Sequence, residues 1–245
     1  MDKNDVIIKM EGIDFSYSSG RQALDKVDFE LAKGQRIGLI GPNGSGKTTL
    51  LQIIMGLLSP SSGAIKLFGR HADTEENFRK AREKIGFLFQ NADDQLFSPT
   101  VIEDVAFGPL NQGRTPEEAE EMSLKTLDEL NLKGFEDRVT HRLSGGEKKL
   151  IALATVLVMA PQVLLLDEPT TGLDEKTVIR IIEILKDLEI SYIIVSHEYD
   201  FLAQTTRQIY SMQKGKIFFD GDSSNLHSHY HRHPGGKVPH DHSHH

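Results

Sequence analysis

Gly41-Pro42-Asn43-Gly44-Ser45-Gly46-Lys47-Thr48 follows the apolar run 36–40 and precedes a helix predicted over 48–58. The stretch matches the pattern G-x-x-x-x-G-K-[ST], whose glycines let successive backbone N–H groups turn inward around a chain of phosphates. In this pattern Lys47 adds positive charge beside the β- and γ-phosphates, Thr48 offers a hydroxyl to Mg²⁺, and the helix N-terminus adds its dipole. The order of strand, glycine-rich loop and helix favours a nucleotide site over an ordinary glycine-rich turn. The residues expected to bind the nucleotide here are Gly41, Asn43, Gly44, Ser45, Gly46, Lys47, Thr48 and Thr49.

The chain outside this loop alternates short apolar runs with helices. Residues 163–166 and 192–195 predict buried strands, and residues 177–188 predict a helix between them. This alternation is typical of a mostly parallel α/β sheet. Further short strands are predicted at 6–8, 27–31, 63–68 and 84–89.

The stretch 91–155 is mostly helical in pattern and is expected to form an insertion on one side of the sheet. Thr115-Pro116-Glu117-Glu118 has the composition of a helix start, with proline at the first helical position and acids in the first turn. Leu124, Leu127 and Leu130 then give an apolar stripe at helical spacing.

Composition narrows the class of protein. The chain has 28 basic and 36 acidic side chains, and the resulting formal charge of −8 argues against a partner that is a nucleic acid. It has no cysteine, which excludes disulfides and thiolate metal sites. The longest apolar run, 151–160, falls well short of the ~20 residues of a membrane span, so it predicts a core helix. The N-terminus lacks the pattern of a signal peptide, and any membrane role is expected to come through a partner.

Polar side chains follow two of the predicted buried strands. Asp167 and Glu168 come directly after 163–166, and His197 follows 192–195. Ligands of open α/β sheets bind beyond the carboxyl ends of the strands, so these side chains are expected beside the phosphate loop. There Asp167 would hold Mg²⁺, Glu168 would polarise the attacking water and His197 would contact the γ-phosphate. The alternative is a solvated strand end for the carboxylates and a structural role for the histidine.

Three further segments resemble motifs of the ATP-binding cassette (ABC) proteins. Leu143-Ser144-Gly145-Gly146-Glu147 resembles their signature, and Asp167-Glu168-Pro169-Thr170 with Gly172-Leu173-Asp174 resembles their Walker B motif and D-loop. Phe89-Gln90 looks like the Q-loop, and His197 like the switch histidine. The order and spacing of these motifs fit the family across residues 3–226.

The resemblance implies a fold and a chemistry. It implies a P-loop nucleotide hydrolase domain over 3–226, with an N-terminal antiparallel β-subdomain and a helical subdomain at about 91–155. It implies ATP and Mg²⁺ as cofactors, with Lys47, Gln90, Glu168 and His197 as catalytic residues and with Thr48, Gln90 and Asp167 around the metal. Tyr17 falls where the family places an aromatic ring that stacks on adenine, although a buried structural tyrosine is the alternative.

In this family two cassettes dimerise head to tail, and each ATP lies between the phosphate loop of one subunit and the signature of the other. The resemblance implies a homodimer in which Ser144 and Gly146 contact the nucleotide of the partner copy. The helix N-terminus at Ser144 is a suitable anion site. The chain departs from the family at Glu147, where Gln is usual, and at Leu150 and Thr155, where many relatives carry Arg. These departures put the usual ion pairs of the helical subdomain in doubt.

The segments 89–97 and 100–109 resemble the ATPase subunits of energy-coupling-factor importers, and among them the cobalt/nickel type. The resemblance implies a peripheral subunit on the cytoplasmic face of the membrane, bound to transmembrane importer subunits. Exposed Leu96 and Phe97 would suit a docking groove for those subunits, or they would pack within the helical subdomain.

The tail 227–245 is of low complexity and is predicted to be disordered. Neutral imidazoles ligate Ni²⁺, Co²⁺ and Zn²⁺, so weak binding at several sites is expected here. A purification tag and a solvated tail without a role are the alternatives. Eight of the 11 histidines lie in the tail: His227, His229, His231, His233, His240, His242, His244 and His245.

Other functions stay open at this point. An energy-coupling-factor ATPase for another substrate, such as a vitamin, uses the same motifs. A soluble cassette ATPase acting on DNA or ribosomes is disfavoured by the acidic charge and by the absence of long basic or coiled-coil insertions. A metal-chelating protein with a secondary ATPase is the third possibility.

Overall fold

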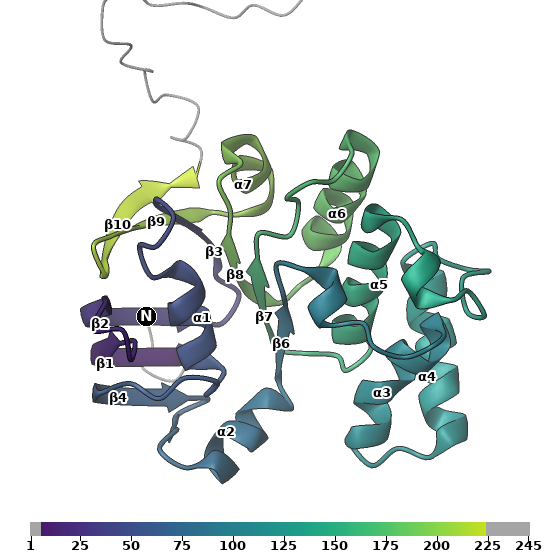
Figure 1. Cartoon of the computed structure of the whole chain (residues 1–245), viewed down its shortest axis with the longest axis horizontal. Helices are drawn as coiled ribbons and strands as arrows, with labels where there is room; N and C mark the ends of the chain where they lie inside the picture. Colours follow the sequence, from purple (N-terminus) through teal and green to yellow (C-terminus); the bar gives the residue numbers. More distant parts are fainter. Residues whose placement is uncertain (1–5, 224–245) are drawn as a thin grey trace, which may run out of the picture.

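The computed structural model describes residues 6–223, and its centre is a six-stranded sheet in the order β10-β9-β3-β8-β7-β6 (Figure 1). The five strands from β9 to β6 are parallel, and β10 pairs antiparallel with β9 at one edge. The predicted parallel α/β sheet is therefore confirmed. The strands are β3 (Arg36–Ile40), β6 (Ile85–Leu88), β7 (Val163–Asp167), β8 (Ser191–Val195), β9 (Gln208–Gln213) and β10 (Lys216–Asp222).

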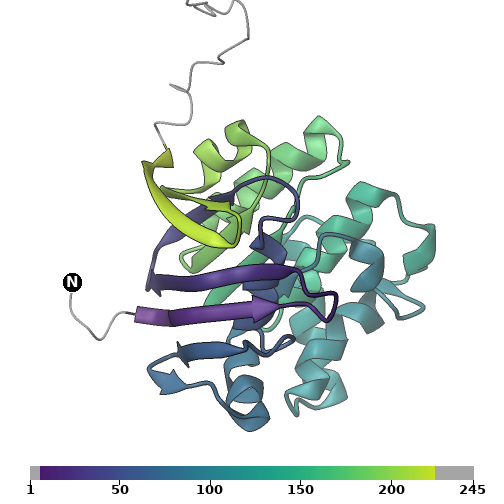
Figure 2. The ribbon, with the colours of Figure 1, turned by 60° about the vertical axis from the view of Figure 1, so that its left-hand side comes forward.

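A second sheet of four antiparallel strands, in the order β2-β1-β4-β5, is built mostly from the N-terminal part of the chain. In Figure 2 the purple pair β1 and β2 lies between the blue β4 and the yellow-green hairpin of β9 and β10. The predicted N-terminal antiparallel sheet is thus present, with strands longer than the short apolar runs suggested. The strands are β1 (Val6–Ser16), β2 (Gln22–Ala32), β4 (Ser62–Leu67) and β5 (Arg70–His71).

Helix ends follow the local capping residues. Pro116 opens one helix as predicted, after a capping box in which the Thr115 hydroxyl accepts from the Glu118 N–H and the Glu118 carboxylate accepts from the Thr115 N–H. The helix predicted from 177 starts two residues earlier, because Asp174 caps it by accepting from the Thr177 N–H. The helices are α1 (Lys47–Ile54), α2 (Glu75–Arg82), α3 (Val101–Asn111), α4 (Pro116–Glu129), α5 (Gly145–Leu157), α6 (Glu175–Asp187) and α7 (Tyr199–Thr205), with short 3₁₀ turns at Ala92–Asp94 and Thr140–Arg142.

The central strands are buried on both faces, and successive residues serve different cores. Val163 and Leu165 of β7 pack in the core that contains α1 and the antiparallel sheet. Leu164 and Leu166 of the same strand pack in the core that contains residues of α5, α6 and α7. Side chains of a strand alternate between its faces, so α1 and α5 lie on opposite faces of the sheet (Figure 1).

The chain between β6 and β7 forms the helical insertion, with α3 and α4 packed together and α5 packed on the sheet. The apolar stripe predicted for the helix after Pro116 is narrower than expected. Leu127 and Leu130 are buried, whereas Leu124 is 40% exposed. The prediction that Leu96 and Phe97 are both exposed is also wrong in part. Phe97 is 66% exposed, but Leu96 is only 8% exposed because it joins the core of the insertion. The apolar run 151–160 lies largely in α5, as the core helix that it predicts.

Two kinds of feature, a membrane-spanning helix and a metal-binding cluster, are absent from residues 6–223, the part of the chain that the structure describes. No helix in this range combines the length and apolar composition needed to cross a bilayer. Nor does it contain a cluster of three or more His, Cys, Asp or Glu side chains that could hold a metal ion. The His-rich tail 227–245 lies outside the described residues, as do the ends of the predicted domain 3–226.

Candidate nucleotide-binding site

The loop between β3 and α1 has a backbone that only glycine tolerates at two places. Gly41 has φ +146° and Gly46 has φ +110°, both in the range that side chains disfavour. A Cβ on Gly41 would lie 2.3 Å from the Met212 carbonyl oxygen, and one on Gly46 would lie 2.4 Å from the Ala23 carbonyl oxygen. The loop is therefore pressed against β9 on one side and β2 on the other, and its shape depends on both glycines.

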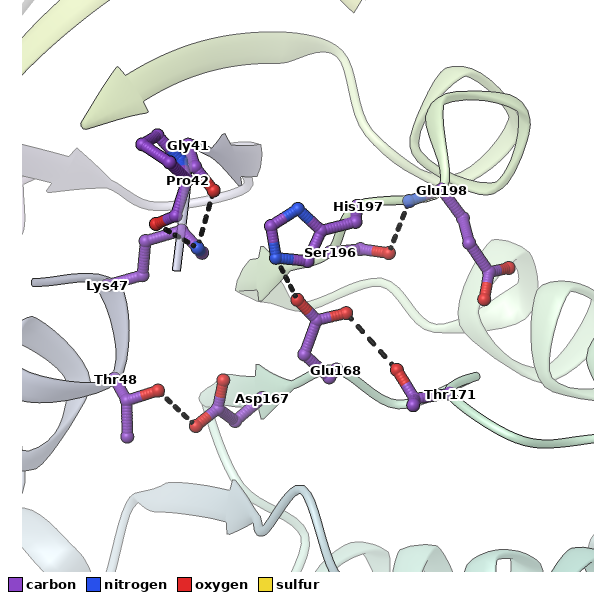
Figure 3. Close-up of polar contacts among 10 residues, drawn as sticks. All are labelled: Gly41, Pro42, Lys47, Thr48, Asp167, Glu168, Thr171, Ser196, His197 and Glu198. Atoms are coloured by element: carbon purple, nitrogen blue, oxygen red, sulfur yellow. Dashed lines mark hydrogen bonds and ion pairs between the residues drawn. The ribbon is translucent and has the colours of Figure 1, made fainter. Parts of the chain in front are cut away.

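Lys47 and Thr48 begin α1 and face the ends of the central strands (Figure 3). The Lys47 ammonium donates to the carbonyl oxygens of Gly41 at 2.7 Å and Pro42 at 3.2 Å, so it lies over its own loop. Burial lowers the pKa of Lys47, while the nearby Glu168 and Asp167 oppose that shift. The Thr48 hydroxyl donates to Asp167 Oδ2 at 2.8 Å, which joins the loop to the end of β7.

Asp167 is the last residue of β7 and is buried. Burial raises its pKa, and the Thr48 hydrogen bond and the charges of Lys47 and Lys149 oppose the rise. Within the described chain, the buried atoms Asp167 Oδ1 and Ser45 Oγ have no hydrogen-bond partner. Buried polar atoms almost always have one, so these atoms are available to a ligand. A carboxylate and a hydroxyl are also the oxygen ligands that Mg²⁺ prefers, and the residues therefore fit this ion.

Glu168 follows in a left-handed backbone conformation, with φ +46°, which costs a non-glycine residue about 1–3 kcal/mol. Its carboxylate lies 3.2 Å from His197 Nε2 and accepts a 3.3 Å hydrogen bond from the Thr171 hydroxyl (Figure 3). Burial raises the pKa of Glu168, while His197 and Lys47 oppose the rise. The arrangement gives a carboxylate that is oriented from both sides and is more basic than an exposed one.

The remaining residues expected at the nucleotide vary in exposure. Asn43, Gly44 and Gln90 are exposed, whereas Thr49 is buried. The Tyr17 hydroxyl shares a 2.8 Å hydrogen bond with the Thr49 hydroxyl. The Tyr17 ring is half-buried, with the Phe15 ring edge-on at 5.0 Å and the Arg21 guanidinium 5.2 Å from its centre. Tyr17 thus makes structural contacts and still exposes part of its ring beside the loop.

The signature segment has a separate position. Ser144 caps α5 and is exposed, and its hydroxyl accepts from the Glu147 N–H at 3.3 Å while Glu147 accepts from the Ser144 N–H at 2.8 Å. Gly146 lies against α6, where an added Cβ would be 2.8 Å from Thr177 Oγ1. The structure therefore brings Lys47, Asp167 and His197 together but leaves Ser144 and Gly146 on the α5 side of the sheet.

Sequence reasoning missed two residues of this region. Thr171 orients the Glu168 carboxylate, and Lys149 is a buried lysine that donates to the backbone carbonyls of Phe89 and Gln90. A lysine just before the apolar residues of α5 was the available signal for Lys149. Two of the residues at which the signature helix departs from the family pattern also have partners. Glu147 pairs with Arg138 at 3.0 Å, and the Thr155 hydroxyl accepts a hydrogen bond from the Gln95 amide.

A glycine-rich loop between a central strand and a helix, with Asp167 and Glu168 at the end of another central strand, defines a P-loop nucleotide hydrolase. The ABC transporter family matches residues 24–171, more than half of the chain. The chain belongs to this family and is an ATPase.

Individual relatives agree with the family. A putative ABC transporter ATP-binding protein of Nitratidesulfovibrio vulgaris is 49% identical over 237 residues, covering 96% of this chain and 86% of the relative. The energy-coupling factor transporter ATP-binding protein EcfA of Methanothermobacter thermautotrophicus is 41% identical over 219 residues, covering 88% and 70% of the two chains.

Solved structures agree as well. CbiO1 from Clostridium perfringens, part of the ABC transporter complex CbiONQ, superposes with a TM-score of 0.82 at 37% identity, covering 91% of each chain. The ATP-binding cassette MJ0796, solved as a dimer in a post-hydrolysis state with ADP and Pi, superposes with a TM-score of 0.79 at 28% identity, covering 86% of this chain and 96% of that one.

Proposed function

We propose that this protein hydrolyses Mg-ATP as one of two copies that energise an importer of the energy-coupling-factor kind, with nickel or cobalt ions as the imported substrate. The observation that carries the two-copy part is the separation of the phosphate loop and the signature on opposite faces of one sheet. One copy therefore offers half of two different sites, and a second copy would complete both.

Within one copy, the phosphate loop would hold the β- and γ-phosphates through its backbone N–H groups and Lys47. Thr48, Asp167 and Gln90 would hold Mg²⁺, which when bound neutralises charge on the phosphate oxygens. The free Oδ1 of Asp167 supports this role, because it has no partner in the described chain. Tyr17 would stack on the adenine.

Glu168 would act as the general base toward the attacking water, because its carboxylate is both buried and oriented by Thr171. His197, 3.2 Å from that carboxylate, would contact the γ-phosphate and keep the base in place. Lys47 would stabilise the charge that develops on the transferred phosphoryl group.

The partner copy would contribute Ser144 and Gly146 at the N-terminus of α5. The exposed Ser144 hydroxyl, the first N–H groups of α5 and the helix dipole would together form the anion site. A homodimer is the simplest assembly, and the dimeric cassette MJ0796 supports it by similarity.

An ATP-dependent dimer tests this proposal. Glu168→Gln should bind ATP without hydrolysing it, and size-exclusion chromatography should then show dimers. Adding Ser144→Arg should prevent them, because the arginine would occupy the space of the γ-phosphate contact. Ser59→Arg, which adds the same charge at an exposed serine after α1, is the matched control and should still dimerise. Dimers that survive Ser144→Arg would contradict the head-to-tail arrangement.

Coupling to a membrane subunit is proposed from the insertion. Phe97 and Phe107 are 66% and 47% exposed and contact each other edge to face at 4.7 Å, which leaves an apolar surface next to the Q-loop. The similarity to EcfA and CbiO1 supports transmembrane partners here, at the cytoplasmic face of the membrane. Phe97→Asp should abolish co-purification with hydrophobic membrane subunits and leave the ATPase activity of the isolated protein unchanged. Stimulation by RNA or DNA instead would favour a soluble cassette ATPase.

The metal substrate is proposed from the resemblance and the His-rich tail, whose residues lie outside the described range. Cutting the chain after Leu226 should weaken Ni²⁺ binding in calorimetry and leave hydrolysis intact. Equal Ni²⁺ affinity in the truncated protein would remove the tail from the proposal. If the reconstituted importer transports a vitamin but neither Ni²⁺ nor Co²⁺, the metal ions are excluded as the substrate and the vitamin takes their place.

A further inference from the structure

The segment that follows β6 is held against α5 from several directions. The Lys149 ammonium donates to the carbonyl oxygens of Phe89 at 3.1 Å and Gln90 at 2.6 Å. The Phe89 N–H donates to Gln95 Oε1 at 3.2 Å, so both polar backbone groups of this residue are engaged. On the surface, Lys148 pairs with Asp93 at 2.6 Å.

Lys149 is an unusual residue for its position. It is only 3% exposed, on a helix whose other buried residues are apolar. Burial lowers its pKa to about 8, and the charge of Asp167 opposes the shift. A buried ammonium is costly unless hydrogen bonds compensate it, and the two carbonyl groups at 89 and 90 supply them. A methionine or leucine would pack there without that cost, so the contribution of Lys149 is the position of these carbonyls.

Gln95 completes the attachment. Its amide nitrogen donates to the Ala152 carbonyl and to the Thr155 hydroxyl, each at 2.8 Å, while its oxygen accepts from Phe89. Thr155 thereby takes part in a neutral hydrogen-bond network at the position where many relatives carry Arg. Residues 89–90 are therefore bound to α5 both directly through Lys149 and indirectly through Gln95.

The same helix begins at Ser144. Lys149 lies five residue steps after Ser144, which corresponds to about 7.5 Å along the helix axis. A hydrogen-bonded helix is stiff over this length, so a displacement of residues 89–90 toward or away from the nucleotide shifts the N-terminus of α5 with it.

We propose that Lys149 and Gln95 are positioning residues that couple Gln90, at one nucleotide, to Ser144, at the nucleotide shared with the partner copy. The inference rests on the two-copy function proposed above. ATP binding in one site would displace Gln90, and α5 would transmit this displacement to Ser144 in the second site. The two sites would therefore bind and hydrolyse ATP cooperatively. Coupling of this kind is typically worth a factor of about 5–150 in affinity.

Lys149→Met is the direct test, because it keeps the length and apolar contacts of the side chain and removes its donors. The Hill coefficient for ATP should fall to 1 and the affinity of the second site for ATP should fall by about 5–150-fold, while the dissociation constant of ATP in the monomer stays unchanged. Lys125→Met, on α4 of the same insertion, is the matched control. Its ion pair with Glu129 is exposed to solvent, where such pairs contribute little, so cooperativity should persist.

Two further variants separate positioning from a general loss of structure. Gln95→Glu removes both amide donors and should lower the Hill coefficient in the same way, even if Lys149→Met fails to fold. Lys149→Arg retains a donor that reaches carbonyl groups and should restore cooperativity in part. Unchanged cooperativity in both Lys149→Met and Gln95→Glu would overturn the inference, as would a loss of monomeric ATP binding in both.

The failure of the parent proposal is distinguishable from the failure of this one. A wild-type protein with a Hill coefficient of 1 and no ATP-dependent dimer would remove the two-copy function itself. A cooperative wild-type protein whose Lys149→Met and Gln95→Glu variants remain cooperative would remove the coupling alone.

Discussion

The two faces of the six-stranded sheet are built in different ways. On the α1 face the Lys47 ammonium is held by its own loop, since it hydrogen-bonds to carbonyls only five and six positions away, while Gly41 and Gly46 fit that loop against β9 and β2. On the α5 face the key contacts join residues 59 and 60 positions apart, such as Lys149 with Gln90 and Gln95 with Thr155. The difference suggests that phosphate binding belongs to a local motif, whereas the signature helix depends on long-range contacts.

The largest effect is expected from Glu168, the proposed general base. Glu168→Gln should lower hydrolysis by about 10³-fold and leave ATP binding intact, because the amide cannot accept the proton of the attacking water. Thr171→Val removes only a hydrogen bond to this carboxylate and should have a far smaller effect. Single-turnover hydrolysis with radiolabelled ATP measures both. Turnover of Glu168→Gln near the wild-type rate would remove Glu168 as the base.

A stability comparison within the phosphate loop comes next. Gly46→Ala should lower the free energy of unfolding by about 3 kcal/mol, because its Cβ would meet the Ala23 carbonyl and its φ is strained. Gly44→Ala has nothing closer than 3.6 Å and should cost about 1 kcal/mol through its left-handed φ alone. Urea denaturation of both variants checks the difference. Equal losses would mean that close packing against β2 does not shape the loop.

Two glycines at the start of α5, the signature helix, allow a second comparison of this kind, with smaller expected effects on the free energy of unfolding. Gly146→Ala should cost about 1–2 kcal/mol, because its Cβ would lie 2.8 Å from the Thr177 hydroxyl, a side chain that can move. Gly145→Ala, with nothing within 4 Å, should stabilise the protein by about 0.5 kcal/mol by reducing the freedom of the unfolded chain. Thermal denaturation distinguishes the two, and a destabilising Gly145→Ala would contradict the open surface at this position.

The smallest effect concerns the departure at Glu147. The bond from the Ser144 N–H, with help from Arg138, holds the pKa of Glu147 below its usual value. The charge of Glu147 therefore stabilises the folded protein at pH values above the usual pKa of a glutamate. This contribution is lost as the pH falls through the lowered pKa. Glu147→Gln should cost about 0.5 kcal/mol at pH 7 and nothing in acid. Urea denaturation at both pH values tests this, and a constant difference would exclude the charge as the cause.

Patterns that depend on sequence neighbours were predictable. The strands at 36–40, 163–166 and 192–195 were identified because buried central strands read as continuous apolar runs. By contrast, β9 and β10 were missed, since their residues are mostly half-buried or exposed and mix polar and apolar types. Helix α2 was missed because only Ala81 among its residues is buried. Leu96 and Phe97 are neighbours of equal apolar character, and only packing decides that one is buried and the other exposed.

The amino-acid sequence by itself determined the chemistry of the phosphate loop, the carboxylates at the end of β7, and the alternation that makes a parallel sheet. Each of these depends on residue types within a few positions of one another, where backbone geometry follows directly from the side chains. Only the tertiary structure decided that Thr48 meets Asp167, that Glu168 meets His197, and that Lys149 holds residues 89–90. Those contacts join distant parts of the chain, and no local pattern encodes which distant carbonyl or carboxylate a polar side chain will reach once the core has packed.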